Sequence, residues 1–474
     1  MVFSSLIFLF SYLPFLLIGN YLWRNRKWQN ILLFGGSLYF YAWGEGERVL
    51  IMLASIIINY FIGRAIGSAK ESRKKRSYLT FGIIINIGVL VYFKYAYFFV
   101  ENLNLLLDYI GTDILLYIKK ERLPIGISFY TFQSISYLID VYRKENKAQR
   151  NFIDVGLYIS LFPQLIAGPI VRYHDIAHQL EHRKSSVEKF SEGVRRFIIG
   201  LGKKVLIANN VAYTVDEIFA LGPAEMTTPL AWMAITGYAI QIYFDFSGYS
   251  DMAIGLGKMF GFDILENFNY PYISKSIKEF WKRWHISLSN WFMDYLYIPL
   301  GGNRGSKFKT YRNLVLVFLI TGFWHGASWS YVFWGLYHGM FIVFEKLGLE
   351  KALERLGKPV QHLYFFIVIM FSWVFFKLED FSYSLQTASC MLGFSAEGSG
   401  FFTVSMFSTP LFWTVYVIGV ITSVPVLTGI QKHAFIVARK PSKVISIVFY
   451  MCIFFLCTIS LVNSTYNPFI YFRF

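Results

Sequence analysis

Long runs of apolar side chains, separated by shorter polar stretches, dominate this sequence. The clearest runs are Met1–Trp23, Asn30–Trp43, Val49–Gly63, Tyr78–Tyr97, Leu157–Ile170, Asn313–Phe344, Leu363–Phe376, Leu411–Leu427 and Val444–Val462. A helix needs about 20 mostly apolar residues to cross ~30 Å of hydrocarbon, and the shorter runs gain length from aromatic or small flanking residues. The pattern predicts an all-α polytopic integral membrane protein with roughly nine to twelve crossings, some of them re-entrant.

Composition agrees with this class. Of the 474 residues, 55% are hydrophobic and only 16% are charged, whereas soluble domains average about 25% charged residues. The first run lacks the basic start and small-residue cleavage pattern of a secretory signal, so we expect it to be the first membrane helix. No Pro/Ser/Gly linker divides the chain, and we expect one domain over residues 1–474.

The net charge of +16 allows two interpretations, a nucleic-acid ligand or the basic loops of a membrane protein. Basic clusters follow the first and third runs, at Arg24–Lys27 and Arg64–Arg76, and two crossings separate them. Both clusters therefore fall on one side, and cytoplasmic loops are the ones that collect Lys and Arg. We expect that side to be the cytoplasm, the N-terminus to lie outside, and no nucleic-acid partner.

A polar stretch between the later runs contains helical periodicity. Ile273–Trp291 places its apolar residues on one face and its lysines on the other, which is typical of a helix lying on the membrane surface. His285 would then lie at the border between lipid and water. Phe190–Asn210 is a second candidate surface element.

His325 is the strongest candidate for chemistry. If the chain is helical from Asn313, thirteen residues at about 1.5 Å each place His325 roughly 20 Å from Arg312, near or past the middle of the bilayer. An ionisable group at that depth is costly and often functional, for example as a general base. The alternative is a packed histidine bonded to a neighbouring helix, with Gly322 and Gly326 as a contact face. On a continuing helix, His338 would face away from His325.

Other polar residues have weaker patterns. Asp245 and Asp251 lie at membrane depth, where Gly248 would allow a broken helix as in transporters, although a structural role in capping a broken helix or pairing with a nearby Arg is favoured. His174, His178 and His182 share one helical face, which fits a metal site but is more typical of a solvated surface.

Several signatures are missing from the sequence. The three cysteines form no metal-ligand or disulfide pattern, and we expect no bound metal. The chain also lacks the phosphate-binding loop, dinucleotide and nucleophile-elbow motifs.

Six motifs, in order, resemble the membrane-bound O-acyltransferase (MBOAT) family. They are Phe162–Tyr173, Tyr243–Asp251, Asn267–Tyr272, Arg283–Ser289, Asp294–Arg304 and Phe323–Trp329, within a motif-bearing core of about residues 123–345. The nearest branch is that of the bacterial alginate O-acetylation protein I and peptidoglycan O-acetyltransferases, and the C-terminal sequence from Asn467 also resembles it. Met293 departs from the arginine that this branch often carries.

The resemblance implies a helical bundle around a central tunnel that opens to both leaflets. It maps the family's catalytic histidine onto His325 and its second motif histidine onto His285, with Asn290 as a partner. Candidates for the tunnel lining or substrate contact are Trp324, Trp329, Ser328, Asp245, Asp251 and Gln164.

The implied function is transfer of acetyl, with acetyl-CoA as the expected donor, for O-acetylation of an exported or cell-wall polysaccharide. We expect a bacterial cytoplasmic (inner) membrane protein with a separate extracytoplasmic acetyltransferase partner of the SGNH type, which has a Ser-Asp-His site. Two alternatives stay open: D-alanyl transfer to teichoic acid from a carrier protein, and a transporter or polymer exporter that uses Asp245 and Asp251.

Overall fold

All regular structure in the computed structural model is helical within the described residues, which are 1–23, 25–394, 400–426, 443–464 and 466–470. The helices are α1 Leu13–Leu22, α2 Arg26–Glu45, α3 Val49–Ser68, α4 Ser72–Lys94, α5 Ala96–Tyr109, α6 Ile127–Arg143, α7 Phe152–Ser160, α8 Phe162–Leu165, α9 Tyr173–His182, α10 Val187–Gly202, α11 Asn209–Ala220, α12 Thr228–Met259, α13 Ile277–Trp281, α14 Ile286–Phe292, α15 Lys307–His325, α16 Trp329–Phe344, α17 Glu350–Leu356, α18 Lys358–Lys377, α19 Phe381–Met391, α20 Val404–Phe407, α21 Pro410–Thr422 and α23 Lys443–Asn463. The predicted helical class is therefore confirmed.

Several helices have the length and composition of membrane spans. In the described part of the chain these segments are Arg26–Ser68, Ser72–Lys94, Lys358–Lys377 and Val444–Asn463, and two shorter apolar segments are Phe8–Leu22 and Pro410–Thr422. Many of their apolar side chains face outward, as lipid-facing surfaces require. The number of crossings stays a prediction.

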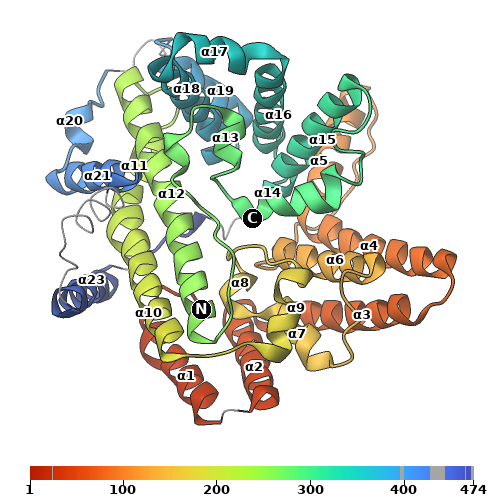
Figure 1. Ribbon diagram of the computed structural model, residues 1–474. Coiled ribbons are helices and arrows are strands. Elements are labelled where there is room, and N and C mark those ends of the chain that lie inside the picture. The colour runs from red at the N-terminus through yellow and green to blue at the C-terminus, as the bar shows by residue number, and fades with distance from the viewer. Residues whose placement is uncertain (24, 395–399, 427–442, 465, 471–474) are drawn as a thin grey trace.

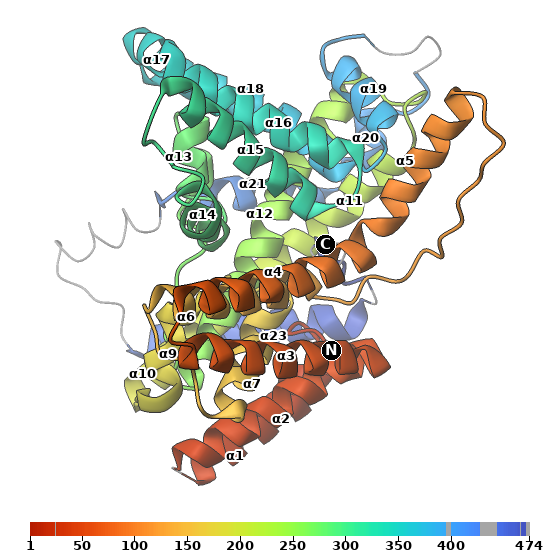
Figure 2. The same cartoon turned by 90° about the vertical axis from the view of Figure 1, so that its right-hand side faces the viewer.

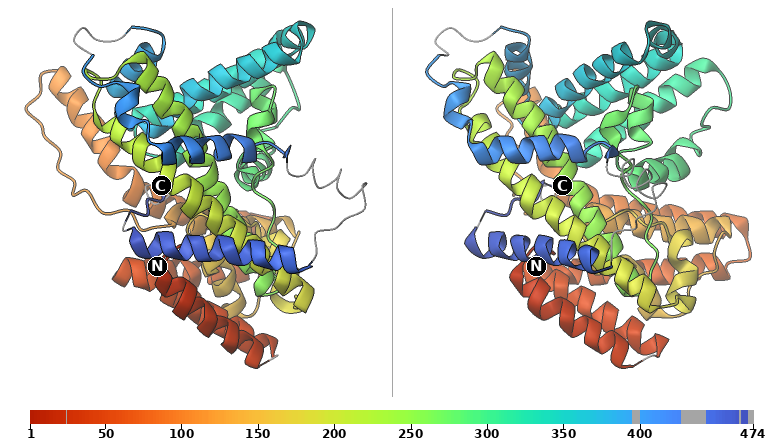
Figure 3. Two further views of the ribbon diagram at one scale, coloured as in Figure 1. Left: turned by 90° about the vertical axis from the view of Figure 1, so that its left-hand side faces the viewer. Right: turned by 60° about the vertical axis from the view of Figure 1, so that its left-hand side comes forward.

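Two short helices, α13 and α14, lie between the long α12 and the hairpin of α15 and α16 in Figure 1, and Figure 2 shows them at one side of the molecule. Figure 2 shows α2, α3 and α4 as a layered group in one half, with α15, α16 and α18 slanting across the other. On the far flank, α21 and α23 cross the outside of α10, α11 and α12 (Figure 3).

One end of the bundle, here called the basic face, gathers the predicted basic clusters. Arg26 at the start of α2 donates to the carbonyl of Arg183, and Gln149 donates to Glu181 at 3.0 Å. Tyr60, near the end of α3, donates to the carbonyl of Arg150 at 2.8 Å. These bonds place Arg26 and the Arg64–Arg76 cluster at the same face, as the charge pattern predicted.

At the other end, here called the opposite face, the loop before α6 contacts the end of α2. The backbone N–H of Ile125 donates to Glu45 at 3.2 Å, and Arg122 pairs with the same carboxylate at 3.5 Å. Trp329, at the start of α16, donates to Asn102 of α5 at 2.9 Å.

Glycines let two pairs of helices approach closely. A side chain at Gly255 of α12 would meet the carbonyl of Gly193 of α10 at 2.6 Å, and one at Gly200 would meet the carbonyl of Gly248 at 2.5 Å. In the second pair, a side chain at Gly322 of α15 would lie 2.3 Å from the carbonyl of Tyr331. Small residues at such crossings are the usual basis of helix packing in membranes.

Two sequence-based expectations about surface helices are wrong. The segment Ile273–Trp291 is not one helix on the membrane but two short helices, α13 and α14, with Ile277, Phe280 and Trp284 fully or nearly fully buried. Phe190–Asn210 belongs to α10, the π-helical turns Lys203–Ala208 and the start of α11, and α10 packs along α12. Helical periodicity identified the apolar face in both cases, but it does not tell whether protein or lipid covers that face.

Two further expectations also change. Leu157–Ile170 forms the end of the nine-residue α7 and the short α8, both enclosed by protein, and so contains no spanning helix. Gly248 does not break α12, which runs without interruption from Thr228 to Met259. The glycine instead allows the approach of α10.

A buried ion pair attaches the C-terminal segment to this core. Lys204 and Asp245 lie 2.5 Å apart with side chains 3% and 2% exposed. Lys204 also donates to the carbonyl of Pro468, and Asp245 accepts the backbone N–H of Ile470 at 2.9 Å. Asp251 is held separately by Arg196 and Lys203. Both aspartates therefore form ion pairs, which was the structural alternative to a transporter-like broken helix.

The change Asp245→Asn should destabilise the protein and release residues 467–470. It leaves the Lys204 ammonium buried without a counter-charge, and breaking a buried pair on one side costs about 3–5 kcal/mol. We expect a lower melting temperature in detergent and faster proteolysis at the C-terminal end. Asp263→Asn, which breaks the exposed pair with Lys189, is the matched control. Equal melting temperatures for the two variants would contradict the assignment.

Candidate active site

His325 is the last residue of α15 and lies inside the protein. Its side chain is buried, and its ring is enclosed by Trp324, Trp334 and Phe376, with centroids 4.8, 5.1 and 5.0 Å away. The helix ends there because Gly326 is extended and Ser328 caps the next helix by accepting the backbone N–H of Tyr331. The break places an imidazole at the end of a helix within an aromatic enclosure.

His285 reaches the same region from the segment between α13 and α14. It is fully buried and adopts a left-handed backbone conformation, with φ +46°, directly before the first residue of α14. A non-glycine residue in that conformation is uncommon and often marks a functional constraint. The edge of the ring packs on Phe246 with centroids 4.7 Å apart.

The indole of Trp324 lies against both imidazoles. Its ring centroid is 4.8 Å from that of His325 and 6.3 Å from that of His285. His285 and Lys94 are also close enough to His325 to interact with it electrostatically. Two residues from distant motifs, predicted separately, therefore share one site.

Asn267 positions His285 and was not singled out from the sequence. Its side-chain oxygen lies 3.2 Å from Nδ1 of His285 and accepts both the backbone N–H and the hydroxyl of Ser287, at 3.2 and 2.9 Å. Its amide donates to Ser250 of α12 at 3.2 Å. The signal in the sequence was its place as the first residue of the Asn267–Tyr272 motif.

The remaining predicted lining residues differ in their positions. Asn290 is half-buried on α14, close in sequence to His285, and Ser328 caps α16. Gln164 is buried and donates to the carbonyl of Tyr158 at 2.7 Å, so it stabilises the turn between α7 and α8. Trp329 is 56% exposed and does not enclose His325, because the break after α15 turns it toward Asn102.

His338 is nearer to His325 than the sequence suggested. The expectation that the two face apart assumed a continuous helix, and the chain breaks at Gly326. His338 lies on α16, where Trp334 contacts both rings, at 5.1 Å from His325 and 4.8 Å from His338. Trp281 of α13 donates to His338 at 3.3 Å, which ties α13 to α16.

The three other histidines of the predicted helical face lie on α9 at the basic face. His178 and His182 are exposed, and His182 lies 4.0 Å from Glu181, whereas half-buried His174 lies close to Asp140 and Glu145. Its hydrogen bond with Asp140 raises the pKa of His174. Asp140, Glu145 and His174 are close enough together to share a cation, but Tyr295 and the backbone of His174 already use the Asp140 carboxylate.

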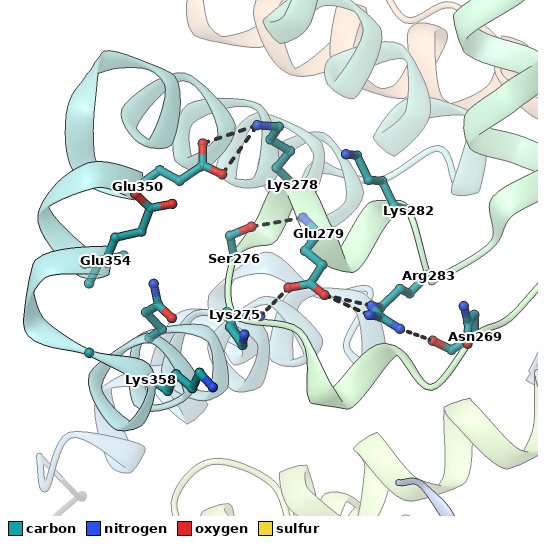
Figure 4. A pocket seen from close by; sticks show the side chains of 13 residues that line it. Asn269, Lys275, Ser276, Lys278, Glu279, Lys282, Arg283, Glu350, Glu354 and Lys358 are labelled. Carbon is teal, nitrogen blue, oxygen red and sulfur yellow. Dashed lines mark hydrogen bonds and ion pairs between the residues drawn. The ribbon is translucent and has the colours of Figure 1, made fainter. Parts of the chain in front are cut away.

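A cavity of about 790 Å³ lies at the basic face, on the outer side of the segment that carries His285 (Figure 4). In it, Lys278 pairs with Glu350 at 3.2 Å and Arg283 with Glu279 at 2.9 Å. Its other cations, Lys275, Lys282 and Lys358, form no ion pair within the described chain. Arg283 lies two residues before His285, so the segment that lines the cavity also carries His285.

A second cavity, of about 470 Å³, lies toward the opposite face and is lined by Gly326 and Ala327, which follow His325 directly. The helical fold with its apolar outer helices defines a polytopic membrane protein, and its two buried histidines lie on segments that each line a cavity.

The chain belongs to the membrane-bound O-acyltransferase family, whose model matches residues 74–349, and it is an O-acyltransferase. It is 46% identical over 395 residues to a probable alginate O-acetylase of Azotobacter vinelandii, covering 83% of this chain and 78% of the relative. A peptidoglycan O-acetyltransferase of Helicobacter pylori is 36% identical, covering 83% and 80% of the two chains. A teichoic acid D-alanyltransferase of Bacillus subtilis is 31% identical over 54% of this chain and 68% of its own.

We expect Asn267→Ala to lower kcat for acyl transfer about tenfold while the donor KM stays unchanged. The change removes the oxygen that contacts the His285 ring and accepts the two hydrogen bonds from Ser287, and buried donors that lose their acceptor are costly. Gln386→Ala, which changes an exposed amide side chain on α19, is the control. Steady-state kinetics on both variants in nanodiscs measure the effect. If the two variants have the same kcat, Asn267 does not position the site.

Proposed function

We propose that this protein takes acetyl from acetyl-CoA at the basic face and delivers it, at the opposite face, for O-acetylation of an exported or cell-wall polysaccharide. The observation that carries the proposal is the pair of buried imidazoles on Trp324, one held by a segment that lines the basic-face cavity and the other by a segment that lines the second cavity. The similarity to enzymes named for acetylating alginate and peptidoglycan supports acetyl as the group transferred.

His325 would act as a general base. Its neutral imidazole takes the proton of an acceptor hydroxyl while that oxygen attacks the acetyl carbonyl carbon. The new C–O bond forms, the thioester C–S bond breaks, and the proton passes to the departing thiolate. The aromatic enclosure of His325 keeps water from competing as the acceptor.

His285 and Trp324 would hold the thioester against His325. His285 is fixed by Asn267, and Trp324 packs on both imidazoles. Asn290, half-buried on the same helix as His285, would contact the donor.

The proposed location is the cytoplasmic membrane of a bacterium, with the basic face toward the cytoplasm. Basic loops on one face support this orientation. Acetyl-CoA is a cytoplasmic metabolite, so acetylation of an exported polymer requires carriage of acetyl across the membrane. An extracytoplasmic SGNH-type acetyltransferase would then complete transfer to the polymer in the cell.

Replacing His325 with Ala should reduce ester-linked acetate on the surface polysaccharide at least 100-fold, because general-base catalysis contributes about 10²–10⁴-fold. His285→Ala should lower it about tenfold, since it removes a buried, positioned contact. The exposed His178→Ala is the control and should retain normal acetate. Acetate is measured after mild alkaline release, with membrane protein levels checked. Normal acetate in the His325 variant would refute the proposal.

The basic-face cavity should bind the phosphates of CoA through its three cations that lack ion pairs. Lys275→Gln, Lys282→Gln and Lys358→Gln should each raise the dissociation constant of CoA about threefold to fivefold, as expected for partly exposed charge contacts. Lys74→Gln, which removes an exposed charge elsewhere on the basic face, should change it little. Binding to the protein in nanodiscs gives the comparison, and unchanged affinity in the triple variant would place the donor elsewhere.

A further inference from the structure

The end of α15, which carries His325, lacks the usual glycine cap. The last carbonyls of a helix have no N–H partners from a further turn, and a glycine in the left-handed conformation often lets the following backbone supply them. Gly326, which follows His325, is extended instead, with φ −170°. Donors from outside the helix are therefore needed to satisfy the carbonyls at this buried end.

Two consecutive residues at the C-terminal end of α4 supply such donors. Lys94, the last residue of α4, donates through its ammonium to the carbonyl of Trp324. Tyr95, the next residue, donates through its hydroxyl to the carbonyl of Phe323 at 2.8 Å. The Tyr95 and Phe323 rings also stack, with centroids 4.3 Å apart and planes at 11°. The end of α4 therefore caps the two residues directly before His325.

The charge of Lys94 also suits the end of a helix. Within the described chain the ammonium forms no ion pair, and its second bond goes to the hydroxyl of Ser128 of α6 at 3.3 Å. It lies 5.7 Å from the ring centroid of Trp324. The C-terminal end of a helix carries a partial negative charge, which a cation stabilises. The end of α15 therefore gives the buried ammonium an electrostatic partner.

The same corner of the chain contacts the far side of the break after α15. Asn102 of α5 accepts the indole N–H of Trp329, the first residue of α16, at 2.9 Å. Phe98 packs on Trp329 with ring centroids 5.7 Å apart. Residues 94–102 thus contact the chain on both sides of Gly326, so the break is held from one direction by one continuous segment.

We propose that Lys94 and Tyr95 are positioning residues for His325, which fix the end of α15 and thereby hold the imidazole against Trp324. The inference rests on the proposed function, because it concerns the same histidine. It adds two residues, outside the predicted motif-bearing core, that act through α15 rather than by contact with a substrate. A loosened helix end would let the imidazole shift, and a displacement of about 1 Å at a reacting group can lower a rate about 100-fold.

Kinetics distinguish a positioning role from substrate binding. In inverted membrane vesicles of the native host, which expose the basic face to added acetyl-CoA, Lys94→Met should lower kcat for acetyl incorporation about tenfold and leave the KM for acetyl-CoA unchanged. Lys94→Arg keeps the charge and the donors and should retain most of kcat. Tyr95→Phe keeps the ring stack, loses only the hydroxyl, and should lower kcat about threefold.

Hydrogen exchange of the full-length protein in nanodiscs tests the cause, because it reports loosening of a helix end without any substrate. The backbone amides of residues 322–326 should exchange at least about threefold faster in Lys94→Met and Tyr95→Phe than in the wild type, since a lost hydrogen bond no longer holds the end of α15. The amides of α12 should exchange as in the wild type.

Two matched controls remove the same kinds of bond elsewhere. Lys189 donates to the carbonyl of Gly261 at 2.8 Å, and Tyr383 donates to the carbonyl of Phe219 near the end of α11 at 2.7 Å. Lys189→Met and Tyr383→Phe should leave both kcat and the exchange of residues 322–326 unchanged.

A raised KM for acetyl-CoA at wild-type kcat in Lys94→Met would overturn the proposal, because the ammonium would then bind the substrate directly. Wild-type exchange of residues 322–326 in both variants, or wild-type kcat despite faster exchange, would overturn it as well. Tyr95→Phe keeps the test valid if Lys94→Met does not fold, since it removes a single hydroxyl.

The result is separable from the proposed function. Normal acetylation in His325→Ala would refute the proposed function, whatever the exchange shows. Loss of acetylation in His325→Ala, together with wild-type kcat and wild-type exchange in Lys94→Met and Tyr95→Phe, would leave the proposed function standing and remove the positioning role.

Discussion

Hydrocarbon offers no hydrogen bonds to a peptide backbone, and this constraint decides where the chain can interrupt its helices. The interruption after α7 is enclosed by other helices, and those between α13 and α14 and after α15 line cavities within the protein. Each interruption leaves backbone N–H or C=O groups without the hydrogen bonds that a continuous helix would form. The two candidate catalytic histidines come from two of these interruptions, His285 before α14 and His325 at the end of α15. These two broken segments are therefore tolerated because protein and cavities, rather than lipid, surround them.

The sequence predicted the helical class and the shared face of the basic clusters, and it singled out His325 as a candidate, because each depends on local information. A run of apolar residues, a cluster of charges or an ionisable group at membrane depth can be found without knowing any long-range contact. The ordered motifs then brought His285 and His325 into one hypothesis. Their meeting at Trp324 depends on packing between segments about 40 residues apart, which periodicity does not describe.

The errors have a common cause. Ile273–Trp291 and the stretch containing His338 were both treated as continuous helices, and a helical period persists across a short break. Ser276 and Ser328, which cap the helices that follow, were the local signals of the breaks. Lys94 was missed for a different reason: a lysine at the end of an apolar run usually extends to the interface. Only the structure shows its bond to Trp324 instead.

Separate supports for the two histidines would help the enzyme keep its two substrates apart. Asn267 and α12 hold His285 on the side of the basic-face cavity, whereas Lys94 and the break at Gly326 hold the segment of His325 on the side of the second cavity. In the proposed function, a donor thioester and an acceptor hydroxyl that enter from opposite faces would meet only at the aromatic enclosure of His325. The Trp324 indole packs on both imidazoles and so links the two supports.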